Sequence, residues 1–274
     1  MAIRLILAVL LLLTLLPAGP SHAAEEVEPS RKVSLALLAD HAVIAPGQSF
    51  WIALKQDMIP HWHTYWRNPG DSGLPTEIDW QLPEGFEAGP TLWQTPERIP
   101  FGPMINFGYE NEAYFLVNIT APPDIEADQV TLSADSEWLV CKETCIPESG
   151  SARLTLETGQ KPVESAQADE IRTSRTRLPQ DVEWPAAFHE KGGQFILDIR
   201  LPESLAEHFK PNSVALFPRA WGMAENAAEA AAKITGDNIL RIVKPRANRP
   251  FADIRDTHFV IAYTDPQGQR QAVR

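Results

Sequence analysis

The clearest pattern along this chain is a short-range alternation of apolar and polar residues. The segment Glu77-Ile78-Asp79-Trp80-Gln81-Leu82, for example, changes character at every position. Successive side chains of a β-strand point to opposite faces, so a period of two is typical of a strand with one buried face. Similar short apolar runs predict six further strands in the first half of the chain: 33–38, 49–55, 61–67, 113–120, 129–140 and 151–157.

Turn-forming residues separate these predicted strands. The chain has 24 prolines and 15 glycines, and many short strands divided by such residues are typical of a β-sandwich. The strongest turn cluster is Asn68-Pro69-Gly70-Asp71-Ser72-Gly73. Residues 83–112 contain five prolines, and we expect this segment to be irregular. A long irregular segment inside a domain is often functional.

The second half of the chain predicts another β domain. Residues 158–182 are polar and charged, and we place a partly helical linker at 161–182, between a first domain at 24–160 and a second at 183–274. Strands are expected at 193–201, 213–217, 238–244 and 257–264. The alanine-rich segment Ala224–Lys233 is helical by propensity. The predicted fold class is therefore all-β, with two sandwich domains in tandem and no cysteine in the second.

The N-terminus has the pattern of a secretory signal peptide. A charged start that includes Arg4 precedes the apolar run Leu5–Leu16, and Ser21-His22-Ala23 offers small residues for cleavage. We predict a signal peptide at 1–23, cleaved after Ala23 or Ala24. A membrane anchor is the alternative, but an apolar run of this length is too short to span a bilayer. An exported protein reaches a compartment in which disulfides form.

The charge of the chain limits its partners. The net charge is −12, and removal of Arg4 with the signal peptide makes it −13. This acidity argues against nucleic acid or an anionic lipid surface as a partner.

Both cysteines of the chain, Cys141 and Cys145, lie four positions apart. Four extended residues span roughly 13 Å, whereas the Cα atoms of a disulfide lie roughly 4.4–6.8 Å apart. If the two cysteines bond, Lys142, Glu143 and Thr144 must form a tight turn. A loop of about five residues contributes only about 2 kcal/mol in the chain-entropy model. The pair is then either a modest structural staple or a reducible, reactive bridge.

Two other kinds of site were considered. His61 and His63 lie two apart on a predicted strand, and with Cys141 and Cys145 they would supply a Cys2His2 set for zinc or copper. The alternative is that both histidines are ordinary members of an aromatic strand. The sequence has no G-x-S-x-G nucleophile motif and no glycine-rich phosphate loop, which argues against those hydrolase and nucleotide-binding classes.

Two segments together resemble a known family. The first is Trp138-Leu139-Val140-Cys141-Lys142-x-x-Cys145-x-Pro147, and the second is His61-Trp62-His63-Thr64-Tyr65-Trp66-Arg67-Asn68-Pro69-Gly70-Asp71-Ser72-Gly73. Both are similar to segments of the periplasmic N-terminal region of the DsbD/ScsB family of thiol:disulfide interchange proteins. The resemblance is strong over about 33–157 and weaker over 183–270. The weaker part is similar to the second β domain of the ScsB-like branch.

The resemblance implies immunoglobulin-like sandwiches and a reversible Cys141–Cys145 disulfide that passes electrons to or from partner proteins, without a cofactor or a bound metal. The implied partners are a membrane thiol hub of the DsbD/ScsB type or a thioredoxin-like periplasmic protein, with no nucleic acid and with membrane contact only through a partner. The implied localisation is periplasmic. The resemblance also implies an aromatic side chain that covers the disulfide. Phe107 is the first candidate for this cap and Tyr109 the second.

Four residues are assigned supporting roles: Tyr65, Trp66, Trp138 and Lys142. The cation of Lys142 would favour a thiolate, and Glu143 would oppose it. We expect Cys145 to attack and Cys141 to resolve the mixed disulfide.

The sequence departs from the family pattern in two ways. The cysteine spacing is shorter than in the best-known members, so loop geometry and redox potential are expected to differ. Hub helices and a thioredoxin-like domain do not follow within the 274 residues. Either these are separate proteins, or the chain is a stand-alone relative. A non-catalytic binding module with a structural disulfide, or a copper- or zinc-binding protein, remains the alternative function.

Overall fold

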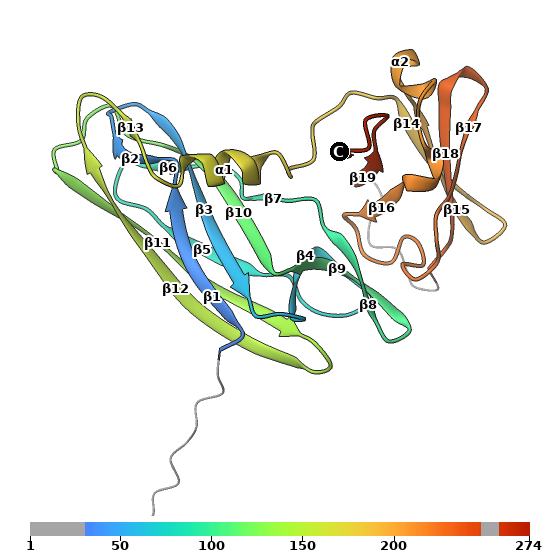
Figure 1. Cartoon of the computed structure of the whole chain (residues 1–274), viewed down its shortest axis with the longest axis horizontal. Coiled ribbons are helices and arrows are strands. Elements are labelled where there is room, and N and C mark those ends of the chain that lie inside the picture. The colour runs from blue at the N-terminus through green and yellow to red at the C-terminus, as the bar shows by residue number, and fades with distance from the viewer. Residues whose placement is uncertain (1–30, 248–257) are drawn as a thin grey trace, which may run out of the picture. The chain divides into compact units, whose positions relative to one another are not determined.

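Two β-sheets form a sandwich in the N-terminal half of the chain (Figure 1). The computed structural model describes residues 31–247 and 258–274, so the predicted signal peptide lies outside the described residues. The first sheet has the order β1 (Val33–Ala39), β3 (Ser49–Met58), β10 (Glu112–Thr120) and β6 (Glu87–Ala88), with β7 (Leu92–Trp93) also paired to β10.

The second sheet carries the cysteines. Its order is β13 (Val163–Glu164), β2 (His41–Ile44), β12 (Cys145–Thr158), β11 (Gln129–Cys141), β4 (His63–Gly70), β9 (Met104–Glu110) and β8 (Glu97–Phe101), with β5 (Glu77–Gln81) paired to β11. The long β11–β12 hairpin is in register from Gln129↔Glu157 to Cys141↔Cys145. Residues 33–164, which hold both sheets, are called the N-terminal sandwich below.

Alternation explains the core of this sandwich. Every second residue of β11 is buried from Val130 to Val140, as the period of two predicts. All of these side chains except Ser136 share one apolar cluster with Ile52, Leu54 and Phe115 of the first sheet. The central strands β3 and β10 are buried over most of their length because they have neighbours on both sides.

All the strands predicted in the first half are present, most with small shifts at their ends, but the strand predicted at 151–157 begins six residues earlier, at Cys145. The third begins at His63 rather than His61, because His61 lies in a turn with φ of 71°. The prediction of an irregular segment at 83–112 is wrong. Four strands, β6 to β9, lie within it, and β8 contains Pro100. β8 is the last strand of its sheet, and an edge strand tolerates a proline because one side of its backbone needs no ladder partner.

A helix lies within the predicted linker and packs on the N-terminal sandwich. Helix α1 (Ala168–Arg175) buries Ile171 against Ala53, Tyr114 and Leu116, on the outer side of β3 and β10. Its acidic first turn and basic last turn match the polarity of the helix dipole. Residues 168–175 are therefore packed structure and not a free connection.

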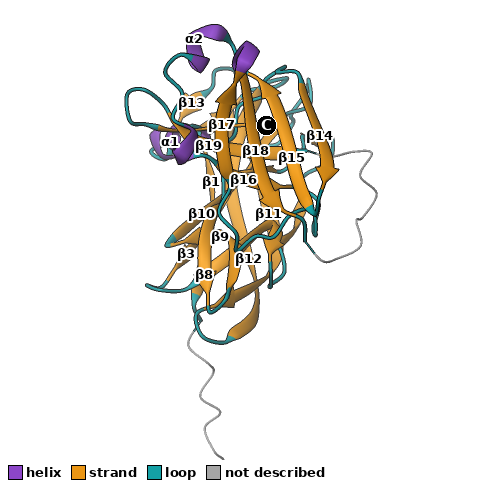
Figure 2. Cartoon of the chain, turned by 90° about the vertical axis from the view of Figure 1, so that its right-hand side faces the viewer, coloured by secondary structure: helices purple, strands orange, loops and turns teal. Residues whose placement is uncertain are grey.

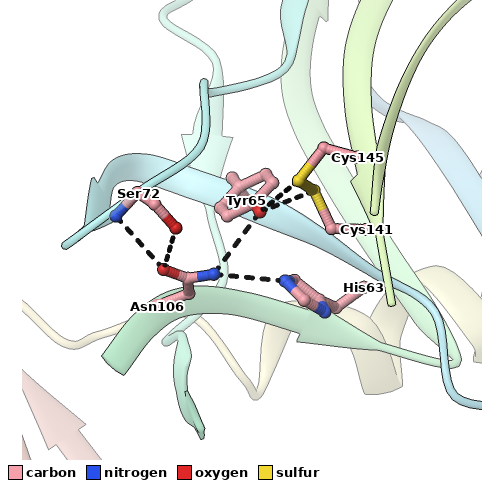
Figure 3. Close-up of a disulfide and its surroundings, with 6 residues drawn as sticks. All are labelled: His63, Tyr65, Ser72, Asn106, Cys141 and Cys145. Carbon is pink, nitrogen blue, oxygen red and sulfur yellow. Dashed lines mark hydrogen bonds between the residues drawn. A yellow bond between two sulfur atoms is a disulfide. The ribbon is translucent and has the colours of Figure 1, made fainter. Parts of the chain in front are cut away.

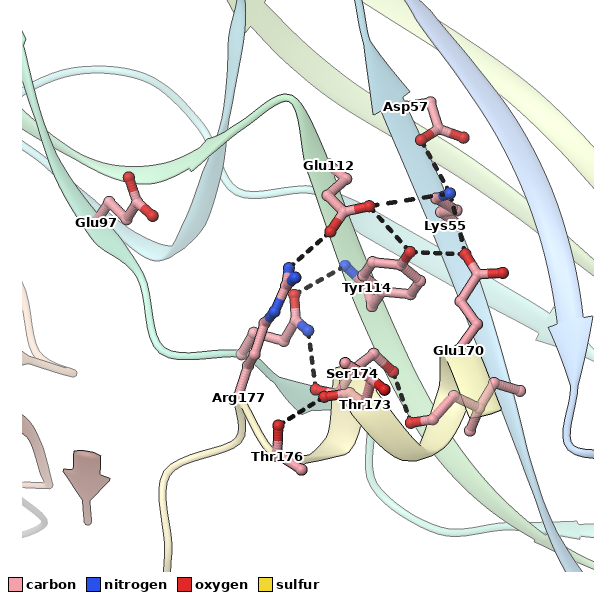
Figure 4. A network of polar contacts seen from close by, with 12 residues as sticks. Lys55, Asp57, Glu97, Glu112, Tyr114, Glu170, Thr173, Ser174, Thr176 and Arg177 are labelled. Atoms are coloured by element: carbon pink, nitrogen blue, oxygen red, sulfur yellow. Dashed lines mark hydrogen bonds and ion pairs between the residues drawn. The ribbon is translucent and has the colours of Figure 1, made fainter. Parts of the chain in front are cut away.

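A polar network ties the same helix to the sheet (Figure 4). Lys55 lies 3.0 Å from a Glu170 carboxylate oxygen and 3.1 Å from one of Asp57. The Tyr114 hydroxyl is within hydrogen-bond distance of both Glu170 and Glu112. Burial lowers the pKa of Lys55, but its hydrogen bonds to Glu170 and Asp57 outweigh burial and hold that pKa above its ordinary value. Lys55 therefore stays charged and bound to α1.

The C-terminal half, called the C-terminal sandwich below, has two smaller sheets (Figure 2). One has the order β14 (Ala186–Lys191), β15 (Gln194–Arg200), β18 (Ile239–Pro245) and β17 (Ala231–Thr235). The other has the order β16 (Ala215–Pro218), β19 (Phe259–Thr264) and β20 (Arg270–Val273). The short helices are α2 (Glu203–Ala206) and two 3-10 turns at Pro211–Ser213 and Gly236–Asn238.

The helix predicted at Ala224–Lys233 is wrong. The last three residues of that segment begin β17, which pairs with β18 from Ala231↔Val243 to Thr235↔Ile239. Ala232 and Ile234 pack against the core of the C-terminal sandwich. Ladder hydrogen bonds and this burial outweigh the modest helix propensity of alanine.

The described residues are all-β apart from these short helices, as predicted. The predicted domain boundaries stay a prediction, since Arg31–Arg274 form one compact unit. Phe217 of β16 packs edge-to-face on Phe107, with ring centroids 5.1 Å apart, and belongs to the cluster of the N-terminal sandwich. No helix among the described residues is long and apolar enough to cross a membrane.

Candidate functional site

Cys141 and Cys145 form a disulfide that closes the β11–β12 hairpin. Cys141 ends β11, Cys145 begins β12, and the backbone N–H of Lys142 donates to the Thr144 carbonyl oxygen in the loop between them. The two Cα atoms are 4.1 Å apart. Cys141 is completely buried, whereas Cys145 is exposed. Cys145 is therefore the more accessible residue of the pair.

The Tyr65 hydroxyl lies against this disulfide (Figure 3). Tyr65 is on β4, which meets β11 at the pair His63↔Cys141. Its Oη atom is 2.8 Å from Sγ of Cys141 and 3.7 Å from Sγ of Cys145. Burial raises the pKa of Tyr65 to about 12, so the phenol keeps its proton at neutral pH. The hydroxyl can therefore donate a hydrogen bond to the buried sulfur.

Asn106 of β9 fixes the direction of that hydroxyl. The side chain of Asn106 is fully buried, and its Nδ2 atom lies 3.4 Å from Oη of Tyr65 and 3.4 Å from Nε2 of His63. An amide nitrogen only donates, so the Tyr65 oxygen accepts from Asn106. The single proton of Tyr65 is then left for the sulfur of Cys141.

His63 completes this buried group. Because the Asn106 amide nitrogen donates to it, Nε2 of His63 must be the unprotonated nitrogen of a neutral ring. Burial lowers the pKa of His63, which favours the same neutral form. His63 also contacts the Tyr65 ring edge-on, with centroids 5.2 Å apart.

The turn after β4 orients Asn106 and covers Tyr65. The backbone N–H and the hydroxyl of Ser72 both donate to Oδ1 of Asn106, at 3.2 and 2.9 Å. Gly73 has a φ of +101°, and a Cβ atom at this position would lie 2.1 Å from Cε1 of Tyr65. Only glycine lets the chain pass so close to the ring.

The other predicted supporting residues lie around the hairpin. Trp66 is buried and packs edge-to-face on Phe217. Trp138 is buried, and its Nε1 atom has no hydrogen-bond partner among the described residues. Lys142 is exposed in the hairpin loop. Their proposed effects on the disulfide stay predictions.

The two predicted cap residues make their described contacts elsewhere. Phe107 is completely buried and packs on Phe217, and the Tyr109 hydroxyl donates to the Gln94 carbonyl oxygen at 2.8 Å. A different ring of the same segment, Phe101 at the end of β8, is partly exposed and lies 6.1 Å from the His63 ring. The capping role of Phe107 and Tyr109 stays a prediction.

The geometry does not assemble the considered Cys2His2 metal set. The two cysteines are bonded to each other, and His61 lies outside β4. In residues 31–247 and 258–274, no group of three or more His, Cys, Asp or Glu side chains is placed to hold a metal ion.

Sequence reasoning missed Asn106, Ser72 and Gly73 as site residues. Asn106 is the one side-chain amide in the otherwise largely apolar segment Met104–Tyr109. A lone amide in a buried strand needs hydrogen-bond partners, and this is the signal that points to it. The Asn68–Gly73 cluster indicated a turn, but nothing in its spacing indicated which side chain it would contact.

The fold and the site define a class: an immunoglobulin-like sandwich with a disulfide at the end of a hairpin and a tyrosine on its buried sulfur. Residues 35–157 match the family model described as "Thiol:disulfide interchange protein DsbD, N-terminal". This segment is similar to the DsbD N-terminal domain, as the resemblance in the sequence predicted. The match and the Cys141–Cys145 disulfide together support thiol–disulfide interchange as the general chemistry.

One solved structure supports this assignment of the fold. The N-terminal periplasmic domain of ScsB from Proteus mirabilis is similar, with a TM-score of 0.56 and 18% identity, over 86% of this chain and 90% of that chain. The yeast GGA1 GAE domain gives a TM-score of 0.25 and 10% identity, over 47% of this chain and 95% of that chain. No curated protein matches the sequence.

Proposed function

We propose that this chain carries out thiol–disulfide exchange with partner proteins in the periplasm. In this proposal a partner attacks the Cys145 sulfur of the oxidised chain, and the Cys145 thiolate is the nucleophile of the reduced chain. Cys141 is the resolving sulfur. One observation supports this assignment above all. Cys145 is exposed, whereas Cys141 is buried with the Tyr65 hydroxyl 2.8 Å from its sulfur.

The exchange follows from these positions. A partner thiolate attacks Sγ of Cys145, the S–S bond breaks, and its electron pair leaves on Cys141 as a thiolate. The Tyr65 hydroxyl then donates to a full negative charge, and hydrogen bonds to charged groups are stronger than those to neutral ones. A second partner thiol breaks the mixed disulfide, so the partner is oxidised and both cysteines of this chain end as thiols. The reverse sequence uses the Cys145 thiolate as the nucleophile.

The proposed partners are thiol proteins, namely a membrane hub of the DsbD/ScsB type or a thioredoxin-like periplasmic protein. The solved ScsB domain similar to this chain is described as periplasmic. The predicted signal peptide at 1–23 and the acidic charge of the chain agree with an exported protein that binds neither nucleic acid nor an anionic membrane.

Single-cysteine variants test the assignment of the two sulfurs. The probe is a thioredoxin-like protein with one cysteine, activated as a mixed disulfide with a chromogenic thiol. Cys141→Ala leaves Cys145 free and is expected to release the chromogen rapidly. Cys145→Ala leaves only the buried sulfur and is expected to react far more slowly. Equal rates for the two variants would contradict the assignment.

The alternative function is a non-catalytic module in which the disulfide is only a staple. The rate at which the disulfide is reduced distinguishes exchange between proteins from a structural staple. The oxidised chain is mixed either with a reduced thioredoxin-like protein or with a small dithiol at equal thiol concentration. Faster reduction by the protein supports exchange between proteins. Reduction by the small dithiol alone would leave the staple interpretation standing.

A further inference from the structure

The Asn68–Gly73 turn is bound on two sides. Toward the disulfide it orients Asn106 through Ser72 and covers the Tyr65 ring through Gly73. Asp71 adds two contacts with β9, since its backbone N–H donates to the Ile105 carbonyl oxygen and its carboxylate accepts from the Ile105 N–H at 2.8 Å. The turn therefore sets the position of the groups around Cys141.

The other side of the turn is held by the C-terminal sandwich. Nδ2 of Asn68 donates to the Pro218 carbonyl oxygen at 2.7 Å, and Nε1 of Trp221 donates to the Gly70 carbonyl oxygen at 2.9 Å. Nδ2 of Asn226 donates to Oδ1 of Asp71 at 3.0 Å. Asn68, Gly70 and Asp71 thus each have a hydrogen-bond partner in residues 218–226.

Two of the contact residues are buried, whereas Trp221 is 47% exposed. Asn68 and Asn226 are both buried. The backbone oxygen of Asn226 accepts from the Arg98 guanidinium at 3.0 Å and lies 3.4 Å from Nζ of Lys244. Asn226 is therefore fixed at its backbone while its side-chain amide reaches Asp71.

We propose that Trp221 and Asn226 are positioning residues for thiol–disulfide exchange, because they hold the Asn68–Gly73 turn and through it the Tyr65 hydroxyl on Cys141. This gives the C-terminal sandwich a role in the chemistry of a disulfide that it does not carry. Hydrogen bonds weaken steeply as their angles and distances depart from the optimum. A small shift of the turn would therefore weaken the bond from Tyr65 to the leaving sulfur.

The inference rests on the proposed function, but its test uses a small dithiol and no partner protein. The dithiol thiolate attacks Cys145, Cys141 leaves as a thiolate, and the second thiol of the reagent closes its own disulfide and releases Cys145. The measurement reports the disulfide chemistry even if the physiological partner is of another kind. Failure of the partner assays above and failure of this test are therefore distinguishable.

The variants are Asn226→Ala and Trp221→Phe, each in the full chain. We expect each to slow reduction of the disulfide roughly three- to tenfold, which corresponds to about 0.7–1.4 kcal/mol of barrier. Asp198→Asn is the matched control, because it breaks the ion pair of Asp198 with Arg241 on β15 and β18 of the same sandwich without touching the turn. The control is expected to react like the parent.

The decisive readout is the same pair of substitutions in a Tyr65→Phe background. A positioning role acts through the Tyr65 hydroxyl, so the substitutions should have no further effect once that hydroxyl is removed. Parent-like rates for both single variants would overturn the proposal. An equal slowing with and without the Tyr65 hydroxyl would also overturn it, since general loosening of the fold acts in both backgrounds. If Asn226→Ala does not fold, Trp221→Phe alone decides, because it replaces the indole with a smaller aromatic ring that lacks the N–H donor to Gly70.

Discussion

The Tyr65 hydroxyl lies 2.8 Å from Sγ of the buried Cys141, while Sγ of Cys145, the more exposed residue, is 3.7 Å away. The asymmetry gives the two sulfurs different environments. A hydrogen-bond donor that cannot lose its own proton at neutral pH stands beside the sulfur that leaves as a thiolate.

Tyr65→Phe is therefore expected to slow reduction of the disulfide by a small dithiol. The donor contributes more to the thiolate in the transition state than to the neutral disulfide, and loss of about 1.4 kcal/mol corresponds to about tenfold in rate. The rate of thiol appearance in stopped flow measures it. Tyr109→Phe is the matched control, because it removes another buried tyrosine hydroxyl whose acceptor is the Gln94 carbonyl oxygen. A parent-like rate for Tyr65→Phe would show that the hydroxyl does not assist the leaving sulfur.

The alternation of residues made most of the N-terminal sandwich predictable. In β11 each inward position is apolar or small, so the period of two and the burial coincide. The cysteine spacing required a reversal of the chain if the pair bonds, and the hairpin provides it. In β8 the pattern was misleading, because a proline in an edge strand looks the same in sequence as a proline in a loop.

The interior of the site was less predictable than the hairpin. Tyr65 and Cys141 are 76 positions apart in the chain, and their contact depends on how β4 lies beside β11. The position of the Asn106 side chain depends on where β9 lies and on the turn that contains Ser72. Such contacts come from tertiary packing, which no local spacing encodes. The resemblance indicated the cysteines and Tyr65, but not the Asn106 amide that donates to the Tyr65 hydroxyl.

The double variant Cys141→Ala/Cys145→Ala is expected to fold. The disulfide closes a loop of about five residues, and the chain-entropy model gives such a loop about 2 kcal/mol. The melting temperature of the double variant should fall by only a few degrees, since about 1 kcal/mol shifts a domain of this size by about 2–4 °C. Circular dichroism on heating measures the shift. A double variant that is unfolded at physiological temperature would identify the bridge as a structural staple.

Substitution of the aromatic residues of the 97–112 segment tests the cover over the disulfide. If Phe107 caps the disulfide, as the resemblance implies, Phe107→Ala speeds reduction by a small dithiol about tenfold, or about 1.4 kcal/mol of barrier. If Phe107 is only a core residue packed on Phe217, the substitution lowers the stability of the fold and does not uncover the bond. Tyr109→Ala and Phe101→Ala are compared in the same assay, because Phe101 is the partly exposed ring beside His63. An increase in the reduction rate for Phe101→Ala alone would show that Phe101, at the end of β8, is the residue that covers the disulfide. If none of the three changes the rate in a folded protein, the segment does not cover the disulfide.

Lys244 gives the fold a pH dependence that can be measured apart from the redox chemistry. Lys244 is buried in β18, and burial, together with the nearby Arg98 cation, lowers its pKa from 10.5 to about 8. Between these two values the unfolded chain holds the proton that the folded chain has lost, so stability rises with pH across this range. Below about 8 both states are charged and the full penalty remains, about 3 kcal/mol at 1.36 kcal/mol per pKa unit.

Lys244→Met removes that penalty and is expected to be more stable than the parent at neutral pH. Loss of the contact from Nζ to the Asn226 carbonyl oxygen offsets part of the gain. The advantage should shrink as pH rises from about 8 toward 10.5, because the parent is then neutral in the folded state. Urea unfolding of both proteins across this range measures the difference, and Lys233→Met, at an exposed position of neighbouring β17, is the control. A difference in stability that stays constant over the range would contradict a lowered pKa for Lys244.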